Sequence, residues 1–257
     1  MDGKVALVTG GSRGIGRAIA GKLAADGCDV VIVARTEADL KQAAGEIAGE
    51  TGRRVAVCAA DLRQPAGIEA AVGELKSAFG RLDILVNNAG ATQGGDFLEQ
   101  DDAVWEDGFA LKFYGALRMS RALWPLLAEA HGAVVNISGG FAHTPDHNFM
   151  IGGAVNAALT NFSKALANRG LIDDVNVNAI HPGPVTTERY EEILTTQAKL
   201  AGIGREEMRE RSLMTSGVRR FARPDEVAGL VAFLVSPAGR HIHGTSQVID
   251  GGGAKSL

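Results

Sequence analysis

The fold of this 257-residue chain is decided by the stretch Thr9-Gly10-Gly11-Ser12-Arg13-Gly14-Ile15-Gly16. It follows an apolar run at residues 5–8 and opens a helical pattern that extends to residue 25. A glycine turn between a strand and a helix lets a pyrophosphate approach backbone N–H groups and the positive end of the helix dipole. The stretch therefore predicts a dinucleotide site built by Gly10, Ser12, Arg13, Gly14, Ile15 and Gly16.

Strand-like and helical patterns alternate along the rest of the chain. The apolar runs lie at residues 5–8, 30–33, 55–58, 84–86, 134–137, 175–180 and 247–249, and helical spacing marks residues 14–25, 37–48, 67–79, 101–130, 155–168 and 224–235. Continuous apolar runs are typical of parallel strands that are covered on both faces. The pattern predicts a single α/β domain over residues 1–257. We expect a Rossmann-type, doubly wound parallel sheet of about seven strands with helices on both faces.

Composition excludes several classes of function. The formal net charge is −4, with no basic patch, which argues against a nucleic-acid-binding protein. No apolar run approaches the roughly 20 residues that a membrane span requires, and the opening residues lack a signal-peptide layout. Two cysteines, Cys28 and Cys58, have no metal-site spacing. We therefore expect a cytoplasmic protein without a membrane segment and without a metal.

The residues that follow the second strand indicate the choice of cofactor. An acidic residue about 20 positions after the glycine turn would bind the 2′-hydroxyl of NAD, whereas an arginine accommodates a 2′-phosphate. Here the strand ends at Ala34 and Arg35 follows, while Arg13 lies in the glycine turn itself. Two cations without an acid favour NADP(H) over NAD(H).

Residues 187–216 interrupt the alternation of strands and helices. This segment is charged and helical in pattern, and it follows the carboxyl end of the sixth strand, where open α/β sheets bind their ligands. We interpret it as a lid over a substrate pocket. The alternative is a solvated helical excursion.

Further landmarks occur in order along the chain: Asp61-Leu62, Asn87-Asn88-Ala89-Gly90, Pro182-Gly183 and Asp250-Gly251-Gly252. Together with the glycine turn they make the chain resemble the classical short-chain dehydrogenase/reductase family over essentially its whole length. The resemblance implies that Asp61 and Leu62 contact the adenine and that Asn88, Ala89 and Gly90 line the ribose and nicotinamide. It also implies that Pro182, Gly183, Val185 and Thr187 border the nicotinamide, and that the protein forms a homodimer or homotetramer.

The same resemblance identifies four positions where the expected catalytic residues are missing. The family uses a tyrosine as general acid/base, a lysine four residues later, a serine that holds the substrate carbonyl and an asparagine that supports a relay water. In this chain Gly152 stands at the tyrosine position, Asn156 at the lysine position, Gly139 at the serine position and Lys112 at the asparagine position. We therefore expect a divergent member that lacks this tetrad.

Nearby side chains offer substitutes, each with a structural alternative. Ser138 ends the fifth strand, where its hydroxyl either serves the site or bonds the backbone. Lys112 offers an ammonium group, and its alternative is a surface lysine. His143, His147 and His181 are candidate acids because an imidazole changes charge near neutral pH, although a histidine more often has an exposed or structural role. Asn156 retains the reach to the nicotinamide ribose but not the charge of a lysine.

Two functions remain open on these observations. The first is an NADP(H)-dependent oxidoreductase that acts on a carbonyl or polarised C=C bond of a small molecule with a non-standard proton donor, because hydride chemistry belongs to the nicotinamide. The second is a catalytically silent NADP(H)-binding protein that works as a sensor or partner subunit. A non-redox lyase or isomerase has no positive feature in its favour.

Overall fold

Seven parallel strands form one sheet in the order β3-β2-β1-β4-β5-β6-β7 in the computed structural model, which describes residues 1–254 apart from the side chain of residue 200. The strands are β1 (Val5–Thr9), β2 (Asp29–Ala34), β3 (Val55–Ala59), β4 (Ile84–Asn87), β5 (Ala133–Ile137), β6 (Asn176–Pro182) and β7 (Ser246–Ile249). The predicted α/β class and doubly wound parallel sheet are confirmed.

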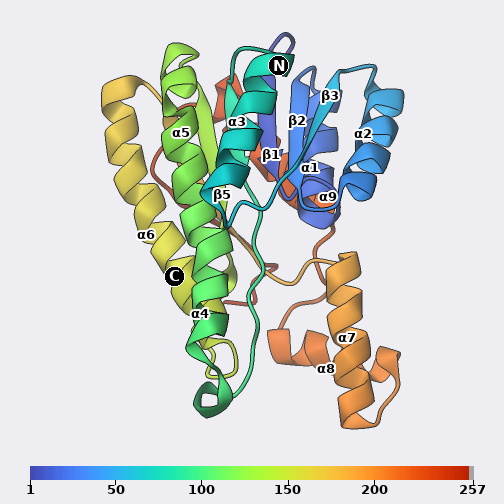
Figure 1. Ribbon diagram of the computed structural model, residues 1–257. Coiled ribbons are helices and arrows are strands. Elements are labelled where there is room, and N and C mark those ends of the chain that lie inside the picture. Colours follow the sequence, from blue (N-terminus) through green and yellow to red (C-terminus); the bar gives the residue numbers. More distant parts are fainter. Residues whose placement is uncertain (255–257) are drawn as a thin grey trace.

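Helices cover both faces of the sheet (Figure 1). On one face lie α1 (Gly14–Ala25), α2 (Glu37–Thr51) and α9 (Pro224–Leu234), and on the other lie α3 (Pro65–Ala78), α5 (Gly115–Glu129) and α6 (Met150–Asp173). Alternate residues of β1 enter the two layers: Ala6 and Val8 pack on the α1 side, and Val5 and Leu7 on the α3 side. Both sides of the strand are apolar because neither faces water.

Two helical regions differ most from the sequence prediction. The expected helix over 101–130 is interrupted: α4 (Asp102–Phe109) leads into a π-helical turn at Ala110–Tyr114 before α5 begins. Helix α6 begins at Met150, five residues before its predicted start, and it contains the buried Gly152 and Gly153. Glycine weakens a helical sequence pattern, but the packing of α6 on β6 maintains the helix there.

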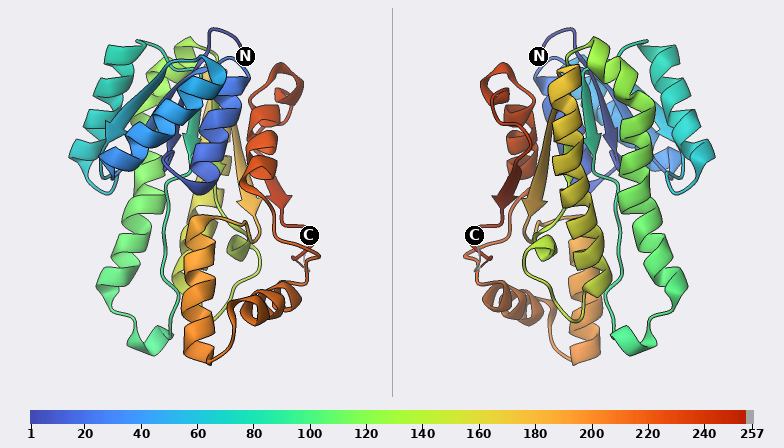
Figure 2. Two further views of the ribbon diagram at one scale, coloured as in Figure 1. Left: turned by 90° about the vertical axis from the view of Figure 1, so that its right-hand side faces the viewer. Right: turned by 90° about the vertical axis from the view of Figure 1, so that its left-hand side faces the viewer.

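The order of the strands reverses between the parallel neighbours β1 and β4: β2 and β3 follow on the β1 side, and β5, β6 and β7 follow on the β4 side. The carboxyl ends of β1 and β4 open a crevice there, the place where open α/β sheets bind ligands. Helices α7 (Glu188–Ala201) and α8 (Arg205–Ser216) stand beyond the carboxyl ends of the strands, as Figure 2 shows.

The described part of the chain contains neither a membrane-spanning helix nor a metal-binding cluster. None of the helices within 1–254 combines the length and apolar character that a membrane crossing requires. The same part of the chain holds no group of three or more histidine, cysteine or acidic residues arranged to bind a metal ion.

Candidate cofactor and substrate site

A cavity of about 480 Å³ lies at the carboxyl ends of β1, β2, β4, β5 and β6. Most of the residues that the sequence assigns to a cofactor line it: Gly10, Ser12, Arg13, Gly14, Ile15, Gly16, Arg35, Leu62, Asn88, Ala89, Gly90, Pro182, Gly183 and Thr187. Asp61, Val185 and Asn156 are not among its lining residues. The cavity continues to Lys112 and Ser138, so the cofactor residues and two of the proposed substitutes share one space.

The glycine turn leaves room and hydrogen-bond donors for a ligand. Gly10 and Gly14 have φ angles of +67° and +56°, in the left-handed region that favours glycine. Arg13 makes no side-chain capping bond to α1, and the first turn of that helix carries no acidic residue. The first N–H groups of α1 are therefore without a side-chain partner, and this end of the helix suits an anion.

A set of hydrogen bonds fixes the loop after β4 against the glycine turn. The backbone N–H groups of Asn88 and Ala89 donate to Thr9 Oγ1, both at 2.9 Å. The Asn88 amide donates to the carbonyl oxygens of Thr9 at 2.9 Å and Gly10 at 3.3 Å. Asn88 therefore holds two walls of the cavity together.

The far end of the cavity carries mixed charge. Exposed Arg35 lies there with Thr36 and Asp39, which the sequence analysis did not assign to the site. Arg13 lies 3.9 Å from Glu192 of α7, and both side chains are more than half exposed. A surface pair of this kind is weak, so Arg13 remains available to a ligand.

Two of the residues outside the lining have clear structural partners. Asp61 Oδ1 accepts from the backbone N–H of Arg63 at 3.1 Å and from its guanidinium at 3.3 Å. Val185 is buried and forms a β-bridge with Ala222. Both residues shape the loops around the cavity.

Lys112 extends from the π-helical turn into the cavity. Its Nζ donates to the backbone oxygen of Ser138 at 2.8 Å. Burial, reinforced by the positive charge of Arg189, lowers the pKa of Lys112 to about 8. The sequence alternative of a surface lysine does not describe this position.

Gly139 and Asn156, which the family resemblance predicts at the serine and lysine positions, lie against one another. A Cβ built on Gly139 would lie 2.7 Å from Nδ2 of Asn156, whose side chain is buried. Asn156 Oδ1 is buried without a hydrogen-bond partner among the described residues. The amide therefore occupies the space into which a serine side chain would extend from position 139.

Gly152, which the family resemblance predicts at the tyrosine position, lies against a phenylalanine ring. A Cβ on Gly152 would overlap the ring of Phe149, which also stacks on Phe141 with ring centroids 4.9 Å apart. The glycine thus makes room for a neighbouring ring instead of opening the site to a bulky substrate.

The remaining substitutes differ in their access to the cavity. Ser138 Oγ donates to the Asn156 backbone oxygen at 3.0 Å and lies 3.1 Å from Thr160 Oγ1. His143 and His147 are exposed and are not lining residues. The ring of His143 packs on buried His181, with centroids 4.5 Å apart.

A hydrogen bond to the backbone fixes the ring orientation of buried His181. Its Nδ1 donates to the Gly139 carbonyl oxygen at 3.1 Å, which leaves Nε2 as a buried acceptor without a partner among the described residues. Burial lowers the pKa of His181, and the charges of His143 and Lys112 act in the same direction.

The segment 187–216 contributes one wall of the cavity through α7. Thr187, Glu188 and Arg189 are lining residues, and Arg189 donates from Nη2 to the Thr92 backbone oxygen at 3.2 Å. Tyr190 lies outside the lining, where its hydroxyl pairs with Ser212 Oγ of α8 at 2.8 Å. Tyr190 therefore joins the two helices.

Several residues of the site were missed from the sequence, among them Arg189, Asp39 and Phe149. Only the position of Arg189, two residues after Thr187, carried a usable signal. Asp39 lies in the first turn of α2, where an acid is expected on helical grounds alone. Phe149 matters through the glycine at 152, a relation that the sequence does not display.

Comparisons with known proteins agree with this geometry. A family model described as enoyl-(acyl carrier protein) reductase matches residues 10–253. An uncharacterised oxidoreductase of Mycobacterium tuberculosis is 35% identical over 98% of this chain and 92% of its own length. The 3-oxoacyl-acyl-carrier-protein reductase FabG of Escherichia coli is 33% identical over 98% of both chains.

Solved structures extend the agreement to the whole fold. L-sorbose reductase from Gluconobacter frateurii, in complex with NADPH and L-sorbose, has a TM-score of 0.96 at 34% identity and covers 100% of this chain and 98% of its own. A single-residue variant of actinorhodin polyketide ketoreductase with NADPH has a TM-score of 0.93 at 29% identity over 98% of both chains. The sheet, the glycine turn and these matches together establish that the chain belongs to the short-chain dehydrogenase/reductase family of oxidoreductases.

Proposed function

We propose that this chain is an NADP(H)-dependent oxidoreductase that acts on a carbonyl or polarised C=C bond of a small molecule through a catalytic site without the usual tetrad. The observation that carries the proposal is the single cavity that extends from Arg35, through the glycine turn, to Lys112. The NADPH complexes of L-sorbose reductase and of the polyketide ketoreductase, both similar along their whole length, support the choice of cofactor.

The residues present fit a dinucleotide. The uncapped start of α1 would receive the pyrophosphate, Leu62 would lie against the adenine, and Gly90, Pro182 and Gly183 would border the nicotinamide. When bound, the reduced nicotinamide supplies a hydride. Gly90 and Gly183 let a flat ring approach the backbone closely at that end, beside the side chain of Lys112, which crosses Gly90.

The preference for NADP(H) over NAD(H) rests on Arg13 and Arg35, two cations on the cavity wall. Among the described residues neither has a carboxylate closer than the 3.9 Å between Arg13 and Glu192. Asp39 is an acid on the same wall and opposes the preference. Two guanidinium groups outweigh one carboxylate in a site that receives a phosphate.

The segment 187–216 serves, in this proposal, as a lid of the single domain. Arg189 joins it to the loop after β4, and the charged surfaces of α7 and α8 let it move without exposing a large apolar face. A closed lid excludes water from the reacting groups. The cytoplasmic location and the dimeric or tetrameric assembly remain predictions.

A catalytically silent NADP(H)-binding protein is the second candidate. The observation in its favour is that Phe149 fills the tyrosine position, so no phenol stands where the family places its acid. Such a protein would bind NADP(H) through the same contacts but would transfer no hydride.

Two measurements, made one after the other, test these proposals. Calorimetric titration with NADPH and with NADH should give micromolar binding of NADPH and much weaker binding of NADH. Oxidation of NADPH is then followed with L-sorbose, ethyl acetoacetate and 2-cyclohexen-1-one, in the steady state and in a single turnover. Binding without any hydride transfer favours the silent protein, and the absence of binding rules out both candidates.

A further inference from the structure

Lys112 lies in the π-helical turn Ala110–Tyr114, and its side chain enters the cavity across the loop after β4. A Cβ on Gly90 would lie 2.8 Å from Cδ and 2.9 Å from Cγ of Lys112, so the aliphatic stem crosses the bare backbone of Gly90. Beyond that crossing, Nζ reaches the Ser138 carbonyl, one residue before Gly139. The ammonium thus lies beside the position from which the family's serine holds the substrate carbonyl.

Among the described residues that line the cavity, Lys112 is the one whose side chain can release a proton near neutral pH. The other ionisable residues among the described lining are Arg13, Arg35, Arg189, Asp39 and Glu188. Guanidinium groups do not deprotonate in proteins, and exposed carboxylates carry no proton near neutral pH. His143 and His147 lie outside the lining, and the Ser138 hydroxyl is already bonded to α6.

The surroundings of Lys112 favour loss of its proton. Within the described part of the chain no carboxylate lies within ion-pair distance of Nζ. The charged group that acts on it is Arg189 from α7, which opposes a further positive charge, and the charge of Lys112 in turn lowers the pKa of the facing His181 from β6. Its one hydrogen bond, to a neutral carbonyl, is a bond that a neutral amine also makes.

We propose that Lys112 is the catalytic proton donor of this enzyme and takes the place of the missing tyrosine from a different helix. The inference rests on the proposed function. For a ketone, the reaction uses one hydride, supplied by the reduced dinucleotide, and one proton. The carbonyl π bond breaks, a C–H and an O–H bond form, and the Nζ–H bonding pair stays on nitrogen. The neutral amine then takes a proton from solvent.

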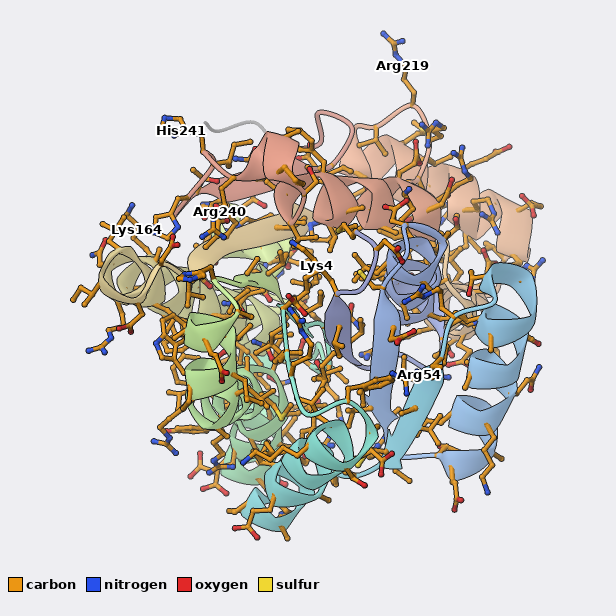
Figure 3. The ribbon with its side chains drawn as sticks, turned by 90° about the horizontal axis from the view of Figure 1, so that it is seen from above. Lys4, Arg54, Lys164, Arg219, Arg240 and His241 are labelled. Carbon is orange, nitrogen blue, oxygen red and sulfur yellow. The ribbon has the colours of Figure 1, made fainter. Side chains whose placement is uncertain are left out.

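Three variants test the assignment. Lys112→Met keeps the stem and removes the ammonium, and Lys112→Arg keeps the charge but cannot donate a proton. Lys164→Met is the matched control, because Lys164 is exposed on α6 at the periphery of the molecule (Figure 3). Single-turnover oxidation of bound NADPH with ethyl acetoacetate should slow by about 10²- to 10⁴-fold in both Lys112 variants and stay unchanged in the control.

A second readout does not depend on turnover. The lysine Cε resonance that disappears in Lys112→Met should titrate near pH 8 in the wild-type protein with NADP⁺ bound, and the rate should fall above that pH. Calorimetry with NADPH shows whether each variant retains its folded cofactor site. If Lys112→Met does not fold, the Lys112→Arg variant and the titration of the wild type together test the proposal.

The possible outcomes separate the two proposals. If the wild type is active and Lys112→Arg is also active, the role of Lys112 is wrong but the proposed function stands. The same conclusion follows if the wild type is active and the Lys112 resonance titrates above about pH 10. Absence of wild-type turnover with L-sorbose, ethyl acetoacetate and 2-cyclohexen-1-one overturns the proposed function, and the assignment of Lys112 with it.

Discussion

The side-chain amide of Asn156 lies where the side chain of residue 139 would begin, 2.7 Å from a Cβ built on Gly139. The resemblance to the family predicts catalytic groups at both positions, and in this structure the two residues present there fit one another. Because the amide is buried, it cannot move aside freely. Gly139 is therefore needed for packing, even though its extended φ of 174° is open to any residue.

Replacing Gly139 should destabilise the protein for as long as Asn156 is present. Gly139→Ala forces the amide to shift, at a cost of about 1–3 kcal/mol in the free energy of unfolding. In the background of Asn156→Ala the same substitution should lose most of that cost. Urea unfolding of the two single variants and the double variant measures the coupling.

Gly140→Ala is the control for this cycle, since its Cβ would lie 3.8 Å from the nearest atom, the Pro182 oxygen. It should change the free energy of unfolding little. Equal costs of Gly139→Ala in both backgrounds would show that the two residues do not interact.

The fold could be predicted from the sequence because its signals are local. The glycine turn at residues 9–16 has its strand before it and its helix after it, and most of the strands are short apolar runs. The choice between a parallel and an antiparallel sheet follows from the helices between the strands. Those features require no knowledge of distant contacts.

The catalytic end of the site could be predicted only in part. The family resemblance predicts missing catalytic side chains at Gly139 and Gly152. It does not predict what lies there instead, because the Asn156 amide comes from another element and the Phe149 ring lies before the helix begins. The π-helical turn at Ala110–Tyr114 likewise has no sequence signal of its own, and it carries Lys112 into the site. Such contacts depend on packing between elements, which a pattern along one chain does not contain.

Arg35 and Asp39 should act in opposite directions on the choice of cofactor. Arg35→Ala removes a guanidinium from the wall of the cavity and should weaken NADPH binding by about 10- to 100-fold, the usual worth of a charge-assisted hydrogen bond. Asp39→Asn removes the opposing charge and should tighten NADPH binding severalfold. NADH, which lacks the 2′-phosphate, should respond weakly to Arg35→Ala.

Calorimetric titration of both nucleotides against the two variants measures this contrast. It is best done at two salt concentrations, because the exposed Arg35 is screened by salt. An equal loss of NADPH and NADH affinity in Arg35→Ala would contradict a contact with the 2′-phosphate.

Lys112 should make the stability of the protein depend on alkaline pH. Its pKa is lowered to about 8 by burial, from 10.5 for an ordinary lysine, so between these values the unfolded chain binds more protons than the folded one. Stability should therefore rise with pH in that window, by up to about 1.4 kcal/mol per pH unit from this group. Below pH 8 the contribution is constant.

Urea unfolding of the wild type and of Lys112→Met at about pH 7, 8.5 and 10 isolates the contribution of this lysine. The wild type should gain stability relative to the variant as the pH rises, and parallel curves would mean that the ammonium is not desolvated. Lys164→Met, which removes an exposed charge, should give a curve parallel to that of the wild type.

Arg189 should control how tightly the segment 187–216 closes. The bond from its Nη2 to the Thr92 oxygen joins α7 to the loop after β4, and its half-buried side chain has a pKa lowered by desolvation. Arg189→Met keeps much of the apolar stem and removes the bond, so we expect faster dissociation of NADPH and a severalfold weaker affinity.

Digestion with a glutamate-specific protease reports on the lid directly, because Glu191, Glu192 and Glu206 lie in α7 and α8. NADPH should slow cleavage there in the wild type and protect Arg189→Met less. Arg219→Met is the matched control, since Arg219 points away from the body of the molecule in Figure 3. A segment that is only a solvated excursion would be cut at the same rate with and without NADPH, because a ligand slows proteolysis only where it shifts the protein away from the open state.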